Sequence, residues 1–333
     1  LRSALPARSE MCIRDSIRPV PISDSPNHFC RFRAHQAIRV PRPPFAWDFC
    51  SPDFGLLRAS PRCDADRLQR VDVAEAMNLP KVVLHDHLDG GLRPATVLEL
   101  AAQRGRPVPA QTPEDLATWF FESADSGSLA RYLDTFTETV GLMQDADSLR
   151  RIAREFVVDM ATDGVIYAEA RWAPQQHLTG GLSAAAATEA VQAGLVDGME
   201  SASRSGATII ARQILCLMRH LDVPEDVVDL AVNHAPGVVG VDIAGPEDGF
   251  PLTPFTNALT RIQAAGIHLT VHAGEAAGPE SVLDALNHGA ERLGHGVRII
   301  EDRDEYEWGP IAQRVLSNQV PLEVCPTSNT QTG

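Results

Sequence analysis

Short apolar segments alternate with amphipathic helical segments along most of this chain, and this alternation restricts the fold more than any other feature. Parallel strands need a long crossover connection, usually a helix, so repeated strand–helix alternation predicts a parallel sheet. Seven such units favour a (β/α)8 barrel over an open sheet. We expect strands at 81–84, 165–171, 207–217, 238–243, 268–271, 292–295 and 320–325. We expect helices at 96–104, 183–203, 225–234, 255–265, 279–287 and 306–317, and several more within 112–162.

The barrel predicted from these segments lacks one strand. Its seventh strand is followed within a few residues by Gly333, the last residue of the sequence. We therefore expect the eighth strand to lie beyond Gly333. The predicted fold is an α/β, TIM-type (β/α)8 barrel that occupies residues 71–333 and is C-terminally truncated after strand 7.

Residues 1–70 differ in character from the rest of the chain. They are rich in Arg and Pro and show neither helical nor strand periodicity. Such sequence rarely packs into a core. No apolar run suits the core of a secretory signal. We expect this segment to be disordered or non-native, and we exclude it from the fold argument.

Charge and cysteine content restrict the partners and the compartment. The net charge is −15; twelve Arg against seven Asp and Glu make residues 1–70 positive, so the remainder is strongly acidic. An acidic body argues against nucleic acid or an anionic membrane as a partner, and no apolar run is long enough to cross a bilayer. Outside residues 1–70, Cys216 and Cys325 both lie in apolar strand-like runs. We interpret them as buried free thiols of a cytoplasmic enzyme.

Polar residues follow or end four of the predicted strands. His85 and His87, two positions apart on one strand, point to the same side. Asp242 and Gly245 end the fourth strand. His272 ends the fifth strand and is followed by Glu275, while His295 ends the sixth. The carboxyl ends of barrel strands form the active face, so these side chains should gather at one rim. Imidazole nitrogens with a carboxylate nearby are typical of a catalytic zinc site.

Each of these signals has an alternative reading when taken alone. A single strand His is more often a hydrogen-bonded core residue, and the run His272–Glu275 could be a turn relaxed by Gly274. Their occurrence on one predicted rim favours the metal site. Glu169 and Arg171 are interpreted as an interior ion pair. The remaining histidines lack partners at ligand spacing and are expected on the surface or in loops: His177, His220, His234 and His268.

The motifs together make the chain resemble the metal-dependent adenosine/AMP deaminase family of the amidohydrolase superfamily. The resemblance extends in order over residues 81–333, and residues 1–70 find no counterpart. The segments that carry it are KVVLHDHLDG at 81–90, YAEAR at 167–171, VGVDIAG at 239–245, VHAGE at 271–275, RLGHG at 292–296 and LEVCPTSN at 322–329.

The resemblance implies hydrolytic deamination of adenosine and 2′-deoxyadenosine to inosine and ammonia, with one Zn²⁺ per chain. It implies that Glu275 protonates purine N1 and that His295 orients or deprotonates the attacking water. The implied partner is a small-molecule purine nucleoside, with no nucleic acid or membrane, and the oligomeric state stays open. The implied zinc ligands are His85, His87 and His272, and the implied substrate contacts are Asp89 with the ribose 5′-hydroxyl, the Gly245 amide with purine N3, and His87.

Three further expectations follow from the same resemblance. Asp89 favours a nucleoside, because relatives that deaminate free adenine are expected to carry Glu there. Residues 116–143 are expected to form a helical lid that contains Trp119, Phe120, Phe121, Tyr132 and Phe136, although ordinary helix packing would explain them equally well. The family's fourth ligand, an Asp, and a neighbouring purine-binding Asp should lie beyond Gly333. A deaminase of adenine or of a modified nucleoside, or a non-catalytic barrel relative, remains open.

Overall fold

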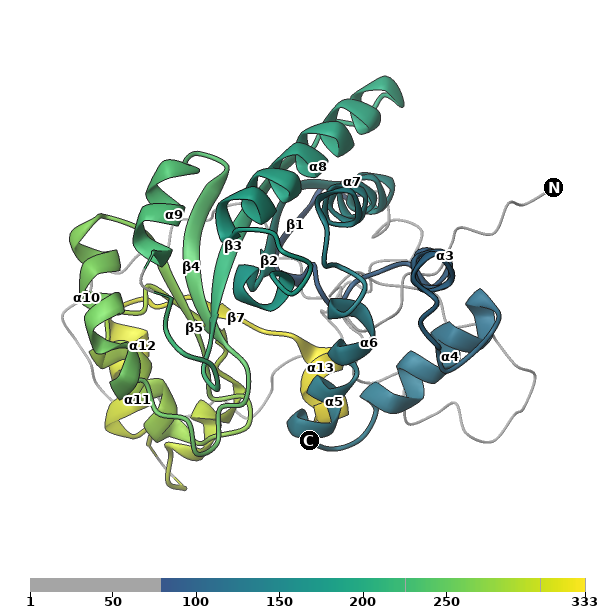
Figure 1. The fold of residues 1–333 in the computed structure, drawn as a ribbon. Coiled ribbons are helices and arrows are strands. Elements are labelled where there is room, and N and C mark those ends of the chain that lie inside the picture. Colours follow the sequence, from purple (N-terminus) through teal and green to yellow (C-terminus); the bar gives the residue numbers. More distant parts are fainter. Residues whose placement is uncertain (1–78, 225, 306, 333) are drawn as a thin grey trace, which may run out of the picture. The chain divides into compact units, whose positions relative to one another are not determined.

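The computed structural model describes residues 79–332 except 225 and 306. Seven parallel strands form one sheet in chain order, so each strand pairs with the next along the sequence (Figure 1). The sheet curves into a nearly closed barrel, which confirms the predicted α/β barrel class. The strands are β1 Lys81–His87, β2 Val165–Trp172, β3 Ile210–Met218, β4 Val238–Ala244, β5 Leu269–Ala273, β6 Arg292–His295 and β7 Leu322–Glu323. The predicted segment 1–70 lies outside the described residues.

Helices connect consecutive strands, as the sequence predicts. Several begin where a side chain caps the first turn: Thr112, Asp145 and Ser183 each accept a backbone N–H three residues later. Such a cap satisfies a helix N–H that has no partner within the helix. The helices are α3 Pro94–Arg104, α4 Pro113–Ala124, α5 Leu129–Asp134, α6 Phe136–Val140, α7 Ala146–Thr162, α8 Ala184–Arg204, α9 Val227–Asn233, α10 Thr256–Ala264, α11 Pro279–Asn287, α12 Pro310–Ser317 and α13 Pro326–Thr332. Three 3₁₀ segments are η2 Pro174–His177, η3 Thr253–Phe255 and η4 Val297–Glu301.

Helices α7 and α8 pack closely on the outside of the barrel because two glycines in α8 face α7. A Cβ added at Gly194 would lie 2.2 Å from the carbonyl oxygen of Arg150, and one at Gly198 would lie 2.5 Å from Val157 Cβ. Either side chain would force the helices apart. The helices thereby cover the β2 and β3 side of the sheet with a continuous apolar layer.

The last strand and helix α12 differ most from the predicted boundaries, and helix α13 was not predicted. The predicted strand 320–325 is reduced to Leu322–Glu323, and the predicted helix 306–317 begins at Pro310. Prolines explain both changes. Pro321 has no N–H for a strand ladder, while Pro310 and Pro326 each occupy the first position of a helix, where the missing N–H costs nothing. Among the described residues no helix is both long and apolar enough to cross a membrane.

Candidate metal centre and active site

A cavity of about 620 Å³ opens at the carboxyl ends of the strands. This location agrees with the predicted active face of the barrel. The structure brings all of the site residues predicted from the sequence to this one cavity. They are His85, His87, Asp89, Gly245, His272, Glu275 and His295.

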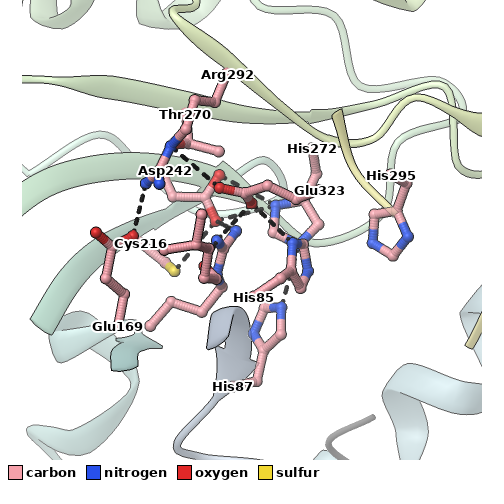
Figure 2. Close-up of polar contacts among 12 residues, drawn as sticks. His85, His87, Glu169, Cys216, Asp242, Thr270, His272, Arg292, His295 and Glu323 are labelled. Carbon is pink, nitrogen blue, oxygen red and sulfur yellow. Dashed lines mark hydrogen bonds and ion pairs between the residues drawn. The ribbon is translucent and has the colours of Figure 1, made fainter. Parts of the chain in front are cut away.

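Three histidines form a cluster suited to a metal ion. One side-chain nitrogen each from His85, His87 and His272 lies within 4.8 Å of the others. The Nε2 atoms of His87 and His272 are 3.1 Å apart, and Figure 2 shows these rings converging beside His295. Two nitrogens bonded to a tetrahedral zinc at about 2.0–2.1 Å would be about 3.3 Å apart. The donor set therefore fits zinc.

Two buried carboxylates orient the rings of this cluster. His85 Nδ1 donates to Glu323 Oε2 at 2.9 Å, and His272 Nδ1 donates to Asp242 Oδ1 at 3.1 Å. With the proton on Nδ1, the Nε2 lone pair of each ring is free to bind a metal. The sequence predicted Asp242 at this rim, but it predicted no role for Glu323. The sequence feature that could have indicated Glu323 is the motif at 322–329, in which it is the one charged residue.

Two histidines of the cluster, His85 and His87, are held in the neutral form. Burial lowers the pKa of His87 to about 3, and burial lowers that of His85 well below its ordinary value. Neighbouring positive groups, Arg171 among them, act in the same direction. Neutral imidazole is the form that binds metal, so these two rings do not need to release protons near neutral pH before an ion enters.

Glu275 lies in the turn that follows β5 and is almost fully buried. Burial raises the pKa of its carboxyl to about 7. Its Oε2 is 3.5 Å from Nε2 of His295 across the cavity. A carboxyl with such a pKa carries a proton in about half of the molecules at neutral pH, and the protonated form can donate it, as a general acid requires.

His295 ends β6 in an unusual backbone conformation. Its φ is 64°, in the left-handed region that non-glycine residues rarely adopt. This conformation costs on the order of 1 kcal/mol or more and commonly marks functional positions. Asn329 Nδ2 donates to His295 Nδ1 at 3.0 Å, which leaves the Nε2 proton facing Glu275. Asn329 ends the motif at 322–329, but the sequence alone predicted no role for it.

Glu247 is a third residue, after Glu323 and Asn329, whose role the sequence did not predict. Its buried carboxylate accepts backbone N–H groups from four consecutive residues, at 2.5, 3.0, 2.7 and 2.9 Å, and also the Ser281 hydroxyl. The four residues are 274–277, so Glu247 holds the turn that carries Glu275. No spacing in the sequence links Glu247 with this turn, because the two belong to different strand–helix loops.

The predicted ion pair between Glu169 and Arg171 is wrong. Arg171 instead contacts Asp242 and Glu323, while Glu169 contacts Arg292 at 2.8 Å. Both side chains face the barrel interior, as alternation predicts. They lie two positions apart along β2 and therefore in different layers of the interior, where each meets partners from other strands.

His177 is also placed differently from the expectation of a surface or loop position. It is fully buried at the end of η2. Its Nδ1 lies 3.0 Å from the carbonyl oxygen of Met143, and its Nε2 lies 3.7 Å from Asp89 Oδ2. The 3₁₀ turn folds it inward without any periodic signal in the sequence. His268 is exposed as expected, while His220 is exposed and also borders the cavity.

Only the second half of the segment expected to form a lid lies beside the cavity. Tyr132 on α5 and Phe136 on α6 line the cavity, and the ring of Phe136 lies 6.1 Å from that of His87. Trp119, Phe120 and Phe121 on α4 do not line it. Phe120 is fully buried in the apolar core, which is the packing role that the sequence analysis left open.

Comparison with known proteins agrees with this geometry. A family model described as adenosine deaminase matches residues 80–333. The chain belongs to the adenosine deaminase family. The adenosine deaminase of Mycolicibacterium gilvum is 48% identical over 262 residues, which cover 76% of this chain and 72% of that protein.

Solved structures similar to this family member include other deaminases. An N6-mAMP deaminase from Arabidopsis has a TM-score of 0.65 at 30% identity, covering 77% of this chain and 75% of that one. An amidohydrolase from Burkholderia ambifaria, solved with bound Zn, has a TM-score of 0.64 at 29% identity, covering 77% and 68%. The barrel fold and the metal-dependent amidohydrolase class of this chain are therefore shared with these proteins.

Proposed function

We propose that this chain hydrolyses adenosine and 2′-deoxyadenosine to inosine or 2′-deoxyinosine and ammonia, using one zinc ion held by His85, His87 and His272. The observation that supports the proposal most directly is the placement of Glu275. A carboxyl whose pKa is about 7 shares one cavity with three converging imidazoles. Metal ligands and a protonated acid are together what hydrolysis of a carbon–nitrogen bond in a purine ring needs.

Zinc bound by these ligands would supply a water molecule acidified toward neutral pH, from a pKa of about 15.7 to about 7. The protein residues would do the rest. Glu275 would donate its proton to purine N1, so that the ring does not accumulate negative charge when oxygen bonds to C6. The hydroxyl added at C6 would then pass its proton to the exocyclic amino group, so that the bond between C6 and this nitrogen breaks, ammonia leaves and C6 becomes a carbonyl. The proton that the water lost before attack would restore the acid form of Glu275.

His295 would orient the attacking water rather than remove its proton. Because Asn329 donates to Nδ1, the Nε2 position carries the hydrogen and points into the cavity toward Glu275. An N–H group donates to an oxygen and fixes its direction of approach. Of the two roles that the family resemblance implies for His295, the contacts support this one.

Asp89 supports a nucleoside as substrate. Burial alone would raise the pKa of its carboxyl, but contacts with His177, His87 and the Ala173 N–H lower it below the ordinary value. The side chain is therefore ionised at neutral pH. A buried negative charge at the cavity wall favours a neutral hydroxyl over a phosphate, because two negative charges would repel at low dielectric. We therefore place adenosine ahead of AMP and of modified nucleotides.

The test is the turnover of adenosine, 2′-deoxyadenosine, adenine and AMP by the purified protein, before and after chelation and zinc addition. The proposal expects ammonia release from both nucleosides, loss on chelation and recovery with zinc. Preference for adenine or AMP would instead support the alternative of another aminopurine substrate. Stoichiometric zinc without any turnover would support a non-catalytic relative.

The buried thiol groups of Cys216 and Cys325 support a cytoplasmic location for the enzyme.

A further inference from the structure

Arg171 places a positive charge in the middle of the barrel beneath the histidine cluster. It lies on β2, and its side chain is fully buried. Nη1 donates to Asp242 Oδ2 on β4 at 2.9 Å, and Nη2 donates to Glu323 Oε2 on β7 at 2.6 Å. Nη2 also donates to the carbonyl oxygen of Leu84 on β1 at 2.6 Å. One guanidinium thus joins β2 to three other strands.

The two carboxylates that Arg171 contacts are those that orient the metal-binding rings. Asp242 accepts from His272 Nδ1 and Glu323 accepts from His85 Nδ1. Two hydrogen-bonded chains therefore start at one guanidinium: one passes through Asp242 to His272, and the other through Glu323 to His85. Figure 2 shows the carboxylates of Asp242 and Glu323 next to the rings of His272 and His85.

We propose that Arg171 is a positioning residue for the metal site, which fixes Asp242 and Glu323 so that the rings of His272 and His85 converge with affinity for zinc. This inference rests on the zinc site of the proposed function. It adds that zinc affinity depends on a guanidinium whose hydrogen bonds go to Asp242, Glu323 and the Leu84 carbonyl and not to the three ligand rings.

The physical basis is the rigid fork of the guanidinium. Two carboxylates buried near each other repel, and each needs a cationic partner to remain in place. A guanidinium presents donors in fixed directions and can hold two carboxylates at once, whereas an ammonium on a flexible stem acts as a point charge. Charge alone would therefore not replace Arg171.

Arg292 provides a matched control. Its Nε contacts the other oxygen of Glu323, Oε1, at 3.1 Å, and its Nη2 contacts Glu169. No contact with Asp242 is among its ion pairs in the described residues. Loss of Arg292 removes a partly buried ion pair from the same carboxylate, but leaves Arg171 holding both Asp242 and Glu323.

The experiment measures zinc affinity of the folded apoprotein by competition with a chelating dye, for the wild type, Arg171→Lys, Arg171→Met and Arg292→Gln. Loss of residues that orient metal ligands typically costs about 10- to 100-fold in metal affinity. We expect a loss of about tenfold or more for Arg171→Lys, a larger loss for Arg171→Met, and wild-type affinity for Arg292→Gln. Visible absorption of the Co²⁺-substituted protein should also change in Arg171→Lys, because it reports ligand geometry.

A merely structural role predicts a different result. Arg171→Lys would then lower the unfolding midpoint of the apoprotein while zinc affinity and the Co²⁺ spectrum stay unchanged, and this would overturn the inference. If Arg171→Met does not fold, Arg171→Lys alone decides. A cycle of Arg171→Lys with Glu323→Gln should be non-additive in zinc affinity, since both act on His85; additivity would also contradict the inference. Failure of the wild type to bind zinc would instead refute the proposed function.

Discussion

The carboxylate of Glu247 accepts the backbone N–H of Glu275 at 3.0 Å, and with it the N–H groups of the residues on either side. Glu247 belongs to the loop after β4 and Glu275 to the turn after β5, so one side chain connects two catalytic loops. Arg219 strengthens this connection by donating to the carbonyl oxygens of Phe250, at 2.6 Å, and His272, at 2.8 Å. The position of the proposed acid therefore depends on the neighbouring loop.

Replacing Glu247 should reduce turnover while zinc stays bound. Glu247→Gln keeps the shape of the side chain but replaces one acceptor oxygen with a donor, so part of the turn at 274–277 loses its anchor. Misplacement of a catalytic group by about 1 Å costs about 10²-fold. We expect kcat to fall by about ten- to a hundredfold, measured by steady-state kinetics. Asp284→Asn is the control: Asp284 accepts the Leu252 N–H from the same loop but contacts none of residues 274–277. Equal losses in both variants would refute a specific role of Glu247.

Replacing the proposed acid itself should have a larger effect. Glu275→Gln preserves volume but cannot supply a proton, and general acid catalysis contributes about 10²- to 10⁴-fold. We expect turnover of adenosine to fall by about 10²-fold or more, with zinc content unchanged by metal analysis. Turnover near that of the wild type would show that Glu275 is not the acid.

The pH dependence of kcat should report the same group. Burial raises the pKa of Glu275 to about 7, and the protonated form is the active one. Activity should therefore be full below pH 7 and fall as the pH rises through and above it. The negative charge of Glu247 also raises the pKa of Glu275, so Glu247→Gln should move this fall to lower pH. A shift to higher pH, or none, would contradict the electrostatic part of the argument.

Gly274 should tolerate no side chain. Its φ is 73°, and an added Cβ would lie 2.8 Å from Val282 Cγ2 and 3.3 Å from Gly296 Cα. Gly274→Ala should lower the free energy of unfolding by about 1–3 kcal/mol, measured in urea. Gly105→Ala separates strain from crowding, because Gly105 has a φ of 60° but nothing within 4 Å of an added Cβ. A smaller loss at Gly274 than at Gly105 would show that crowding has no effect.

The chain should fold without its N-terminal segment. We propose that residues 1–70 contribute nothing to the barrel at 71–333, because their composition does not favour packing. Their deletion should leave both the melting temperature and the turnover unchanged. Deletion through Leu84 is the control, since it removes half of β1, which pairs with β2. A drop of more than a few degrees on the shorter deletion would contradict the proposal.

Local periodicity in the sequence was sufficient for the strand–helix order and for the rim that carries the site. The strand at 292–295 and the helix at 279–287 agree with the structure at both ends. His85, His87, His272 and Glu275 could be placed together because every parallel strand of a barrel presents its carboxyl end to the same face.

Only the tertiary structure decided which groups hold those residues in place. His85 and Glu323 are 238 residues apart in the sequence and 2.9 Å apart in the barrel. Strand alternation places Arg171 inside, but the register of β2, β4 and β7 decides that it contacts Asp242 and Glu323 and not Glu169. Periodicity records which face a side chain occupies. It contains no information on the layer or the opposing strand, and these depend on how the whole sheet curves.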